Sequence, residues 1–126
     1  MADPILIRED AASIAKLTLN NPKALNALSD EMLNTLHAEL SKIAADPSIR
    51  AVILSGAGKV FCAGHDLKEM TAARQSEDGG KAYFKDLFTR CGNLMTAITR
   101  MPQPVIAQAH GIATAAGCQL VASCDM

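Results

Sequence analysis

Two apolar runs, each followed by very small residues, constrain the fold of this chain more than any other feature. Residues 51–54 form an unbroken apolar run, and residues 105–109 form a second strand-like run. Such runs are typical of strands that are covered on both faces, as in parallel sheets. A helical pattern follows each run. This alternation predicts an α/β fold that stops part-way through its pattern.

The chain before the first run supplies a hairpin and a helix. Residues 5–8 and 15–20 are predicted to pair as strands, because the second alternates apolar and polar residues and a polar turn separates the two. A helix then begins at a cap on Ser29 or Asp30 and ends before Pro47. Its apolar residues fall on one face: Met32, Leu33, Leu36, Leu40 and Ile43.

Three further helices are expected. Asp66 can cap the first of them, with Glu69 three residues on, as in a capping box. A flexible linker at 76–80 precedes a long amphipathic helix that ends at the prolines of 101–104. Its apolar face comprises Phe84, Leu87, Phe88, Cys91, Leu94, Met95 and Ile98. The last helix is expected over about 113–122.

Composition and charge exclude several classes of protein. With 126 residues, 49% of them apolar and 20% charged, the chain has the size of one globular domain. A formal charge of −1 and an aromatic content of 3% provide neither a basic surface nor a stacking platform, so neither nucleic acid nor an anionic membrane is an expected partner. The first five residues have no leader pattern and no stretch is long enough to span a membrane, so we expect a cytoplasmic protein.

The cysteines and histidines do not indicate a metal site. Cys62, Cys91, Cys118 and Cys124 form no Cys-x-x-Cys pair and stand among apolar or small residues. Buried free thiols in a reducing compartment are therefore favoured over a disulfide or a metal site. The three histidines have no metal-ligand spacing either, so no metal is expected.

Known nucleotide and hydrolase motifs do not fit. Gly56-Ala57-Gly58-Lys59 follows the first apolar run, but a dinucleotide fingerprint needs a third glycine where Phe61 stands. A Walker A loop needs glycine at Ile53 and a hydroxyl residue at Val60. The chain has no Gly-x-Ser-x-Gly motif on which a serine hydrolase site could be built.

Two strand-to-helix junctions made of small residues are the remaining candidates for a functional site. The first junction is residues 61–67 and the second is residues 110–120. Each leads from a strand into a helix, whose first backbone N–H groups are unpaired and favour negative charge. If the two converge, they could form an oxyanion hole. The alternative is that the small residues only allow tight packing of helix on strand, and the sequence alone leaves both open.

Four segments resemble the enoyl-CoA hydratase/isomerase (crotonase) superfamily. Residues 21–28 resemble its first CoA-contacting loop, and residues 61–67 resemble its F-x-A-G-x-D-[LI] oxyanion motif. Residues 104–107 followed by 111–120 resemble its next strand and second oxyanion motif, and residues 124–125 resemble the end of that segment. Together these motifs cover nearly the whole chain in the family's order. The Ala-Thr-Ala-Ala-Gly-Cys-Gln run is most similar to a branch of hydratase-domain-containing proteins.

The resemblance implies a crotonase-like spiral of ββα units that ends here after the second oxyanion-hole helix. Residues 1–126 would then be the N-terminal part of a single domain, without the C-terminal trimerisation region. A homotrimer or hexamer is expected when the protein is full length. An acyl-CoA thioester is the expected partner. Coenzyme A is part of that substrate, so no separate cofactor is expected.

The resemblance also assigns site residues. It implies that the backbone N–H groups of Ala63 and Ala116 form the oxyanion hole, and it places Gln119 at the position of the first catalytic glutamate. It implies contacts to the CoA moiety from Lys23, Ala24, Leu25, Ala63, Gly64, His65 and Asp66. Hydration of a 2-enoyl-CoA is the best specific function that it suggests.

The departures from the family pattern open alternatives. An amide at Gln119 can orient a water molecule but has no proton to exchange near neutral pH. The second glutamate is expected beyond Met126. His65 is expected to be a wall of the pocket, with a role as a base as the alternative. A catalytically silent acyl-CoA-binding or regulatory protein, or an inert truncated product, are therefore the alternatives to an active enzyme.

Overall fold

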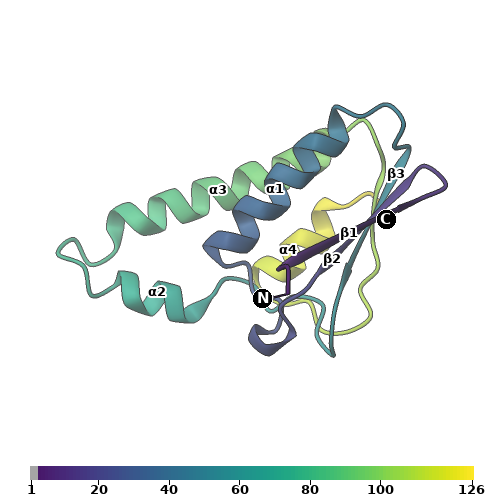
Figure 1. Ribbon diagram of the computed structural model, residues 1–126. Coiled ribbons are helices and arrows are strands. Elements are labelled where there is room, and N and C mark those ends of the chain that lie inside the picture. Colours follow the sequence, from purple (N-terminus) through teal and green to yellow (C-terminus); the bar gives the residue numbers. More distant parts are fainter. Residues whose placement is uncertain (1–2) are drawn as a thin grey trace.

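The computed structural model describes residues 3–126 and shows a four-stranded sheet with helices packed against it (Figure 1). The order of elements confirms the α/β prediction. They are β1 (Leu6–Ala11), β2 (Ile14–Leu19), the 3-10 turn η1 (Pro22–Ala24), α1 (Asp30–Ala44), β3 (Ala51–Gly56), α2 (Leu67–Ala73), α3 (Lys81–Arg100), β4 (Val105–Ala107) and α4 (Ala116–Ser123). Met1 and Ala2, part of the segment expected to carry no leader, lie outside the described residues.

The sheet joins an antiparallel hairpin to two parallel strands. Its order is β1-β2-β3-β4, with β1 antiparallel to β2 and the other two pairs parallel. Ala12 and Ser13 form the hairpin turn with positive φ, as a two-residue turn between twisted strands requires. Parallel neighbours end at the same edge of a sheet, so the segments that follow β3 and β4 leave it side by side.

Only one face of this sheet is fully covered, because α1, α3 and α4 lie on the same side of it (Figure 1). Val52 and Leu54 of β3 are buried, whereas Ile53 between them is partly exposed. The prediction that both apolar runs are covered on both faces is therefore wrong. β4 is also shorter than the expected 105–109, since it ends at Ala107.

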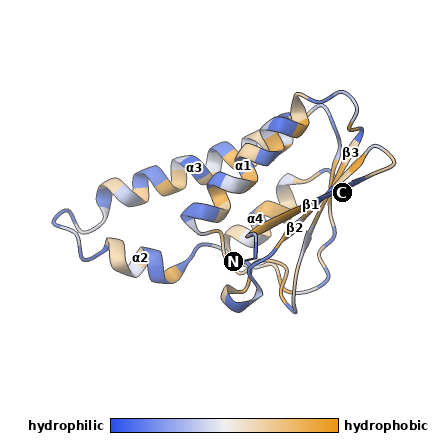
Figure 2. Ribbon diagram, in the orientation of Figure 1, coloured by the Kyte–Doolittle hydropathy of each residue, from blue (hydrophilic) through white to orange (hydrophobic). Residues whose placement is uncertain are grey.

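The core lies between this sheet face and the helices, whose apolar sides turn toward it (Figure 2). Ser29 caps α1 by accepting the Met32 N–H at 3.1 Å, and the five predicted residues of that helix are buried. α3 buries Leu87, Cys91, Leu94, Met95 and Ile98. Phe88 is 54% exposed, so its predicted place on the buried face is wrong.

The starts of α2 and α4 differ from the predictions in detail. Asp66 caps α2 by accepting the N–H groups of Lys68 and Glu69, as predicted. The capping-box partner is wrong, because the Glu69 carboxylate accepts a bond from Asp30 of α1 instead. α4 begins three residues later than expected, because Ala113 still pairs with the first junction in an isolated bridge.

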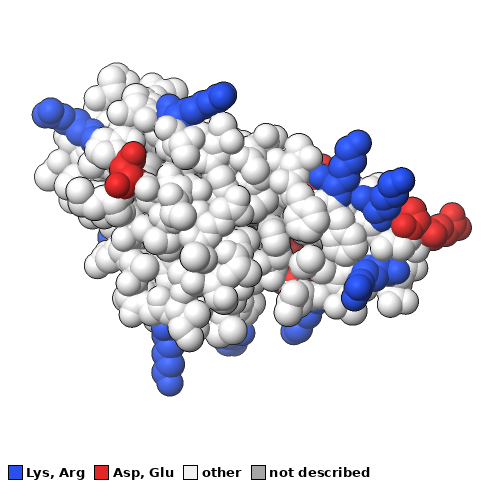
Figure 3. Space-filling model, turned by 180° about the vertical axis from the view of Figure 1, so that it is seen from behind, with Lys and Arg blue, Asp and Glu red and all other residues white. Residues whose placement is uncertain are grey.

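The charged side chains and the cysteines differ in where they lie. Seen from behind, charged side chains stand mainly around the margin of the molecule and leave the middle of this face largely uncharged (Figure 3). Within residues 3–126, no helix is both long and apolar enough to cross a bilayer. All four cysteines are free; Cys62 and Cys91 are buried as expected, whereas Cys118 is exposed.

Candidate functional site

The two junctions meet at the edge of the sheet where β3 and β4 end. The N–H of Phe61 donates to the Ile112 carbonyl at 2.9 Å, and that of Cys62 donates to the same oxygen at 3.2 Å. In return, the Thr114 N–H donates to the Cys62 carbonyl at 3.1 Å. The convergence that the sequence left open is therefore present.

Glycines allow this close approach. A Cβ on Gly117 would overlap the Cys62 carbonyl oxygen, so α4 can begin against the first junction only because that residue has no side chain. A Cβ on Gly64 would lie 3.2 Å from the Ala116 nitrogen. The tight packing of helix on strand, which the sequence left as the alternative to an oxyanion hole, is therefore present.

The segment expected to contact CoA lies beside the first junction. η1 carries Lys23 and Ala24, and Leu25 follows it in the left-handed conformation with φ of 54°. The Leu25 carbonyl accepts the Ala63 N–H at 3.1 Å. Three residues further on, the Leu28 N–H donates to the Gly64 carbonyl at 2.7 Å. The structure therefore brings the two predicted CoA-contacting segments together.

The backbone N–H groups of the junctions are not equally available. Because the Ala63 N–H donates to Leu25, it is not free to bind a thioester oxygen, and the prediction that it forms the oxyanion hole is not supported. The N–H groups of His65 and Ala116 donate to no acceptor among the described residues. Gly64 is the residue before His65 and lies against the Ala116 nitrogen. Two unpaired donors thus stand close together.

The turn into α4 contains strained backbone. Ala115 has φ of 53° and ψ of −126°, a conformation that residues other than glycine rarely adopt. It precedes Ala116, the first residue of α4, whose N–H is left without an intrahelical partner. The backbone strain therefore lies next to the unpaired Ala116 donor.

Comparison with known proteins identifies this arrangement. A model described as enoyl-CoA hydratase/isomerase matches residues 9–126. The chain belongs to this family. Enoyl-CoA hydratase domain-containing protein 3 of Xenopus laevis is 45% identical over 123 residues, which make up 98% of this chain and 40% of that protein. The chain thus spans less than half the length of this curated relative of the enoyl-CoA hydratase/isomerase family.

Solved structures agree on the fold. An enoyl-CoA hydratase of Mycobacterium smegmatis superposes with a TM-score of 0.91 at 52% identity, over 98% of this chain and 47% of that one. Human enoyl coenzyme A hydratase domain-containing protein 3 superposes with a TM-score of 0.87 at 39% identity, again over 98% and 47%. The predicted crotonase-like fold and the resemblance to the hydratase-domain-containing branch are confirmed.

The comparisons contradict the expected location. The names of relatives in Xenopus laevis, Danio rerio and Homo sapiens include the word mitochondrial. They point to mitochondria rather than to the cytoplasm, so the expectation of a cytoplasmic protein is wrong. The lack of a leader pattern in the first five residues was not enough to predict the compartment.

Three predicted side chains of this enoyl-CoA hydratase/isomerase family member have distinct surroundings. Asp66 uses its carboxylate to cap α2. Gln119 is exposed on α4, and its side chain bonds to no described residue. The His65 ring packs against Phe88 with centroids 5.7 Å apart, and burial lowers its pKa, so the ring is neutral at pH 7. This packing fits a pocket wall better than a base.

Asn26 is a structural residue of the site that the sequence analysis did not single out. It is fully buried, and its amide oxygen accepts the Asn21 N–H at 2.8 Å. Its amide nitrogen donates to the carbonyls of Ala57, Val60 and Phe61 at 2.8, 2.9 and 3.2 Å. Asn26 therefore joins the CoA-contacting segment to the start of the first junction. The sequence feature that could have drawn attention to Asn26 is a polar residue between the apolar Leu25 and Ala27.

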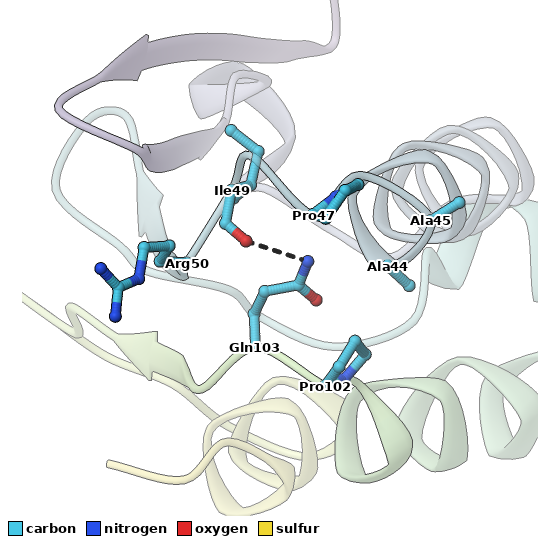
Figure 4. Close-up of a pocket in the computed structure, with 7 residues that line it drawn as sticks. All are labelled: Ala44, Ala45, Pro47, Ile49, Arg50, Pro102 and Gln103. Carbon is cyan, nitrogen blue, oxygen red and sulfur yellow. Dashed lines mark hydrogen bonds between the residues drawn. The ribbon is translucent and has the colours of Figure 1, made fainter.

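A surface hollow lies elsewhere in this family member. It measures about 530 Å³ and is lined by Ala44, Ala45, Pro47, Ile49, Arg50, Pro102 and Gln103 (Figure 4). These residues lie at the end of α1 and just before β3 and β4, at the opposite edge of the sheet from the junctions. The Gln103 amide nitrogen donates to the carbonyls of Ile43 and Ile49 at 2.7 and 3.2 Å, so it closes the end of α1. Within residues 3–126, no cluster of side chains could hold a metal ion.

Proposed function

We propose that this chain binds an acyl-CoA thioester and stabilises its enolate oxyanion with the backbone N–H groups of His65 and Ala116. The observation that carries the proposal is the meeting of these two unpaired donors across Gly64. Membership of the enoyl-CoA hydratase/isomerase family supports the choice of a thioester over other carbonyl compounds. The free donors therefore take the role that the sequence had given to Ala63 and Ala116.

The donors suit the charge that develops during hydration of a 2-enoyl-CoA. When water adds to the β-carbon, negative charge moves onto the thioester oxygen, and donors already aimed at that oxygen need no reorganisation. Removing one such donor typically costs about 3 to 4 kcal/mol of transition-state stabilisation. Hydration is therefore the specific reaction that we propose.

Exposed lysines support binding of the anionic CoA moiety. Lys23 is exposed on η1, Lys59 is exposed in the loop before the first junction, and Lys68 is exposed at the start of α2. The loops that carry Lys23 and Lys59 are in contact, since a Cβ on Gly58 would reach the Pro22 side chain. These three cations lie on the segments that meet at the site, where they can attract phosphate groups.

A second candidate function is thioester binding without turnover. Gln119 favours it, because an exposed amide at this position can hold a water molecule by hydrogen bonding but cannot exchange a proton with it. The chain would then be an acyl-CoA-binding or regulatory protein. Assembly into homotrimers or hexamers stays a prediction for the whole protein under either function.

The test is titration calorimetry with crotonyl-CoA, free CoA and S-butyl-CoA, followed by a hydration assay on the same sample. S-butyl-CoA is a thioether that has neither the carbonyl oxygen nor the double bond of crotonyl-CoA, so it cannot accept a hydrogen bond from the oxyanion donors. We expect crotonyl-CoA to bind more than about tenfold more tightly than S-butyl-CoA, because only crotonyl-CoA can accept the two hydrogen bonds from the His65 and Ala116 N–H groups. Equal affinities would disprove the oxyanion site. Tight binding without hydration would select the second function.

A further inference from the structure

The first junction leads into a helix that packing alone does not hold. No residue of α2 is buried, and Leu67 at its start is 73% exposed. Glycines with positive φ stand on both sides of it, Gly64 (98°) before the helix and Gly80 (91°) after it. Met70 packs partly against the core. The position of α2 therefore depends strongly on polar contacts.

One carboxylate supplies such a contact. Glu69 of α2 accepts the backbone N–H of Asp30 on its Oε1 at 2.8 Å. Asp30 is the first residue of α1, where the N–H groups have no partner within the helix and form the positive end of its dipole. The bond therefore attaches α2 to the start of α1.

The residue that Glu69 contacts is itself held in place. The Asp30 carboxylate accepts Arg90 Nη2 at 2.6 Å and the Tyr83 hydroxyl at 3.2 Å, both from α3. Arg90 also donates from Nε to Asp86 at 2.7 Å, one turn away on the same helix. Asp30 is thus held by α3, and Glu69 connects α2 to it.

His65 lies between two attachments of the same segment. On its N-terminal side, the Gly64 carbonyl accepts the Leu28 N–H at 2.7 Å. On its C-terminal side, Glu69 binds Asp30 at 2.8 Å. Loss of the Glu69 bond would leave the segment that carries the His65 N–H with its backbone attachments on the N-terminal side, including that of Ala63 to Leu25.

We propose that Glu69 is a positioning residue that keeps the His65 backbone N–H directed at the thioester oxygen, an inference that rests on the proposed function. The charged neighbours of Glu69 are Asp30, Asp66 and Arg90. Burial raises the pKa of Glu69, so its ionised form is costly at this place. Gln at position 69 would keep the accepting oxygen without the charge, and it therefore isolates the hydrogen bond from the charge.

The test follows crotonyl-CoA labelled with carbon-13 at the thioester carbonyl, whose NMR shift moves downfield when N–H donors polarise it. We expect Glu69→Ala to lose about half of this shift while its affinity falls by about threefold, because the Ala116 donor and the CoA contacts remain. Glu69→Gln should restore the shift. Glu31→Ala is the matched control, since Glu31 is an exposed acidic residue in the first turn of α1, next to the residue that Glu69 binds. A full shift in Glu69→Ala would overturn the proposal.

Hydrogen exchange without ligand separates this inference from the proposed function. In Glu69→Ala, the amides of residues 64–73 should exchange at least about tenfold faster, with β2 and β3 unchanged, because only the local attachment is lost. Unchanged exchange in that segment would overturn the positioning role even if crotonyl-CoA binds. Failure of the unaltered chain to bind crotonyl-CoA would refute the proposed function instead, whatever the exchange rates show.

Discussion

The two junctions reach the same edge of the sheet by different means. The first, residues 61–67, is held by hydrogen bonds to segments remote in the sequence, such as that from Ala63 to Leu25. The second, residues 110–120, bonds to the first through Ile112 and Thr114 and also packs closely on it, because a Cβ on Gly117 would overlap a carbonyl oxygen there. Each junction contains an N–H group, that of His65 or that of Ala116, that donates to no acceptor among the described residues. Similar chemistry therefore rests on two kinds of support.

This difference predicts how each junction fails. Hydrogen bonds can be removed singly, and each removal costs a limited amount while the backbone keeps its path. Close backbone packing cannot be weakened in small steps in this way, because even one added methyl group must displace main-chain atoms. The second junction should therefore be the less tolerant of substitution.

The largest effect is expected for Gly117→Ala, which attacks the packing of the second junction. The new Cβ would overlap the Cys62 carbonyl, so we expect a loss of about 3 kcal/mol or more in the free energy of unfolding. Urea unfolding followed by circular dichroism measures it. Gly92→Ala is the control, because nothing lies within 4 Å of that helical position, and a gain of about 0.5 to 1 kcal/mol is expected. Similar losses in both variants would contradict the packing argument.

The next effect removes the hydrogen bonds that support the first junction. Asn26→Gly leaves the Asn21 N–H and the carbonyls bound by Asn26 without their partner in a buried site. We expect a loss of about 2 to 3 kcal/mol in urea unfolding. Asn26→Ala should lose about 1 kcal/mol more, because its φ of 53° disfavours alanine. If both variants unfold at the unaltered midpoint, these bonds do not support the junction.

The local elements could be predicted from the sequence, because their signals are local. Alternation predicted the hairpin, and helical spacing predicted the buried face of α1. The uncovered sheet face could not be predicted, since an apolar run such as 51–54 does not reveal which side the helices occupy. The resemblance supplied the family, which the comparisons confirm.

The site was predicted in outline but not in its hydrogen bonds. The motif drew attention to the first junction, yet whether Ala63 or His65 has the free N–H depends on Leu25, a residue remote in the sequence. Glu69 shows the same limit, because its expected local partner is replaced by Asp30 of another helix. Hydrogen bonds between segments that are remote in the sequence decide which N–H and carboxylate groups are free to act. The residue spacing within one segment does not predict those bonds.

Ala115→Gly tests the strain in the second junction. Backbone at φ of 53° and ψ of −126° costs about 1 to 3 kcal/mol for alanine, and glycine avoids most of it. Glycine also loses more entropy on folding, by about 0.5 to 1 kcal/mol. We therefore expect a net gain of about 1 kcal/mol, measured by urea unfolding. A loss of stability would mean that the Ala115 methyl group contributes packing that outweighs the strain.

The smallest effect concerns pH and the first junction. Burial lowers the pKa of His65 from its ordinary value of 6.5, so the unfolded chain takes up a proton before the native chain does as the pH falls. The stability due to the neutral ring is thus complete above pH 6.5 and is lost as the pH falls below it. His65→Phe keeps a ring against Phe88 but cannot titrate, so its unfolding midpoint should fall less than that of the unaltered chain between pH 7 and pH 5. Equal slopes would mean that the His65 ring is open to solvent, and the first junction would then have polar attachments without the aromatic contact to α3.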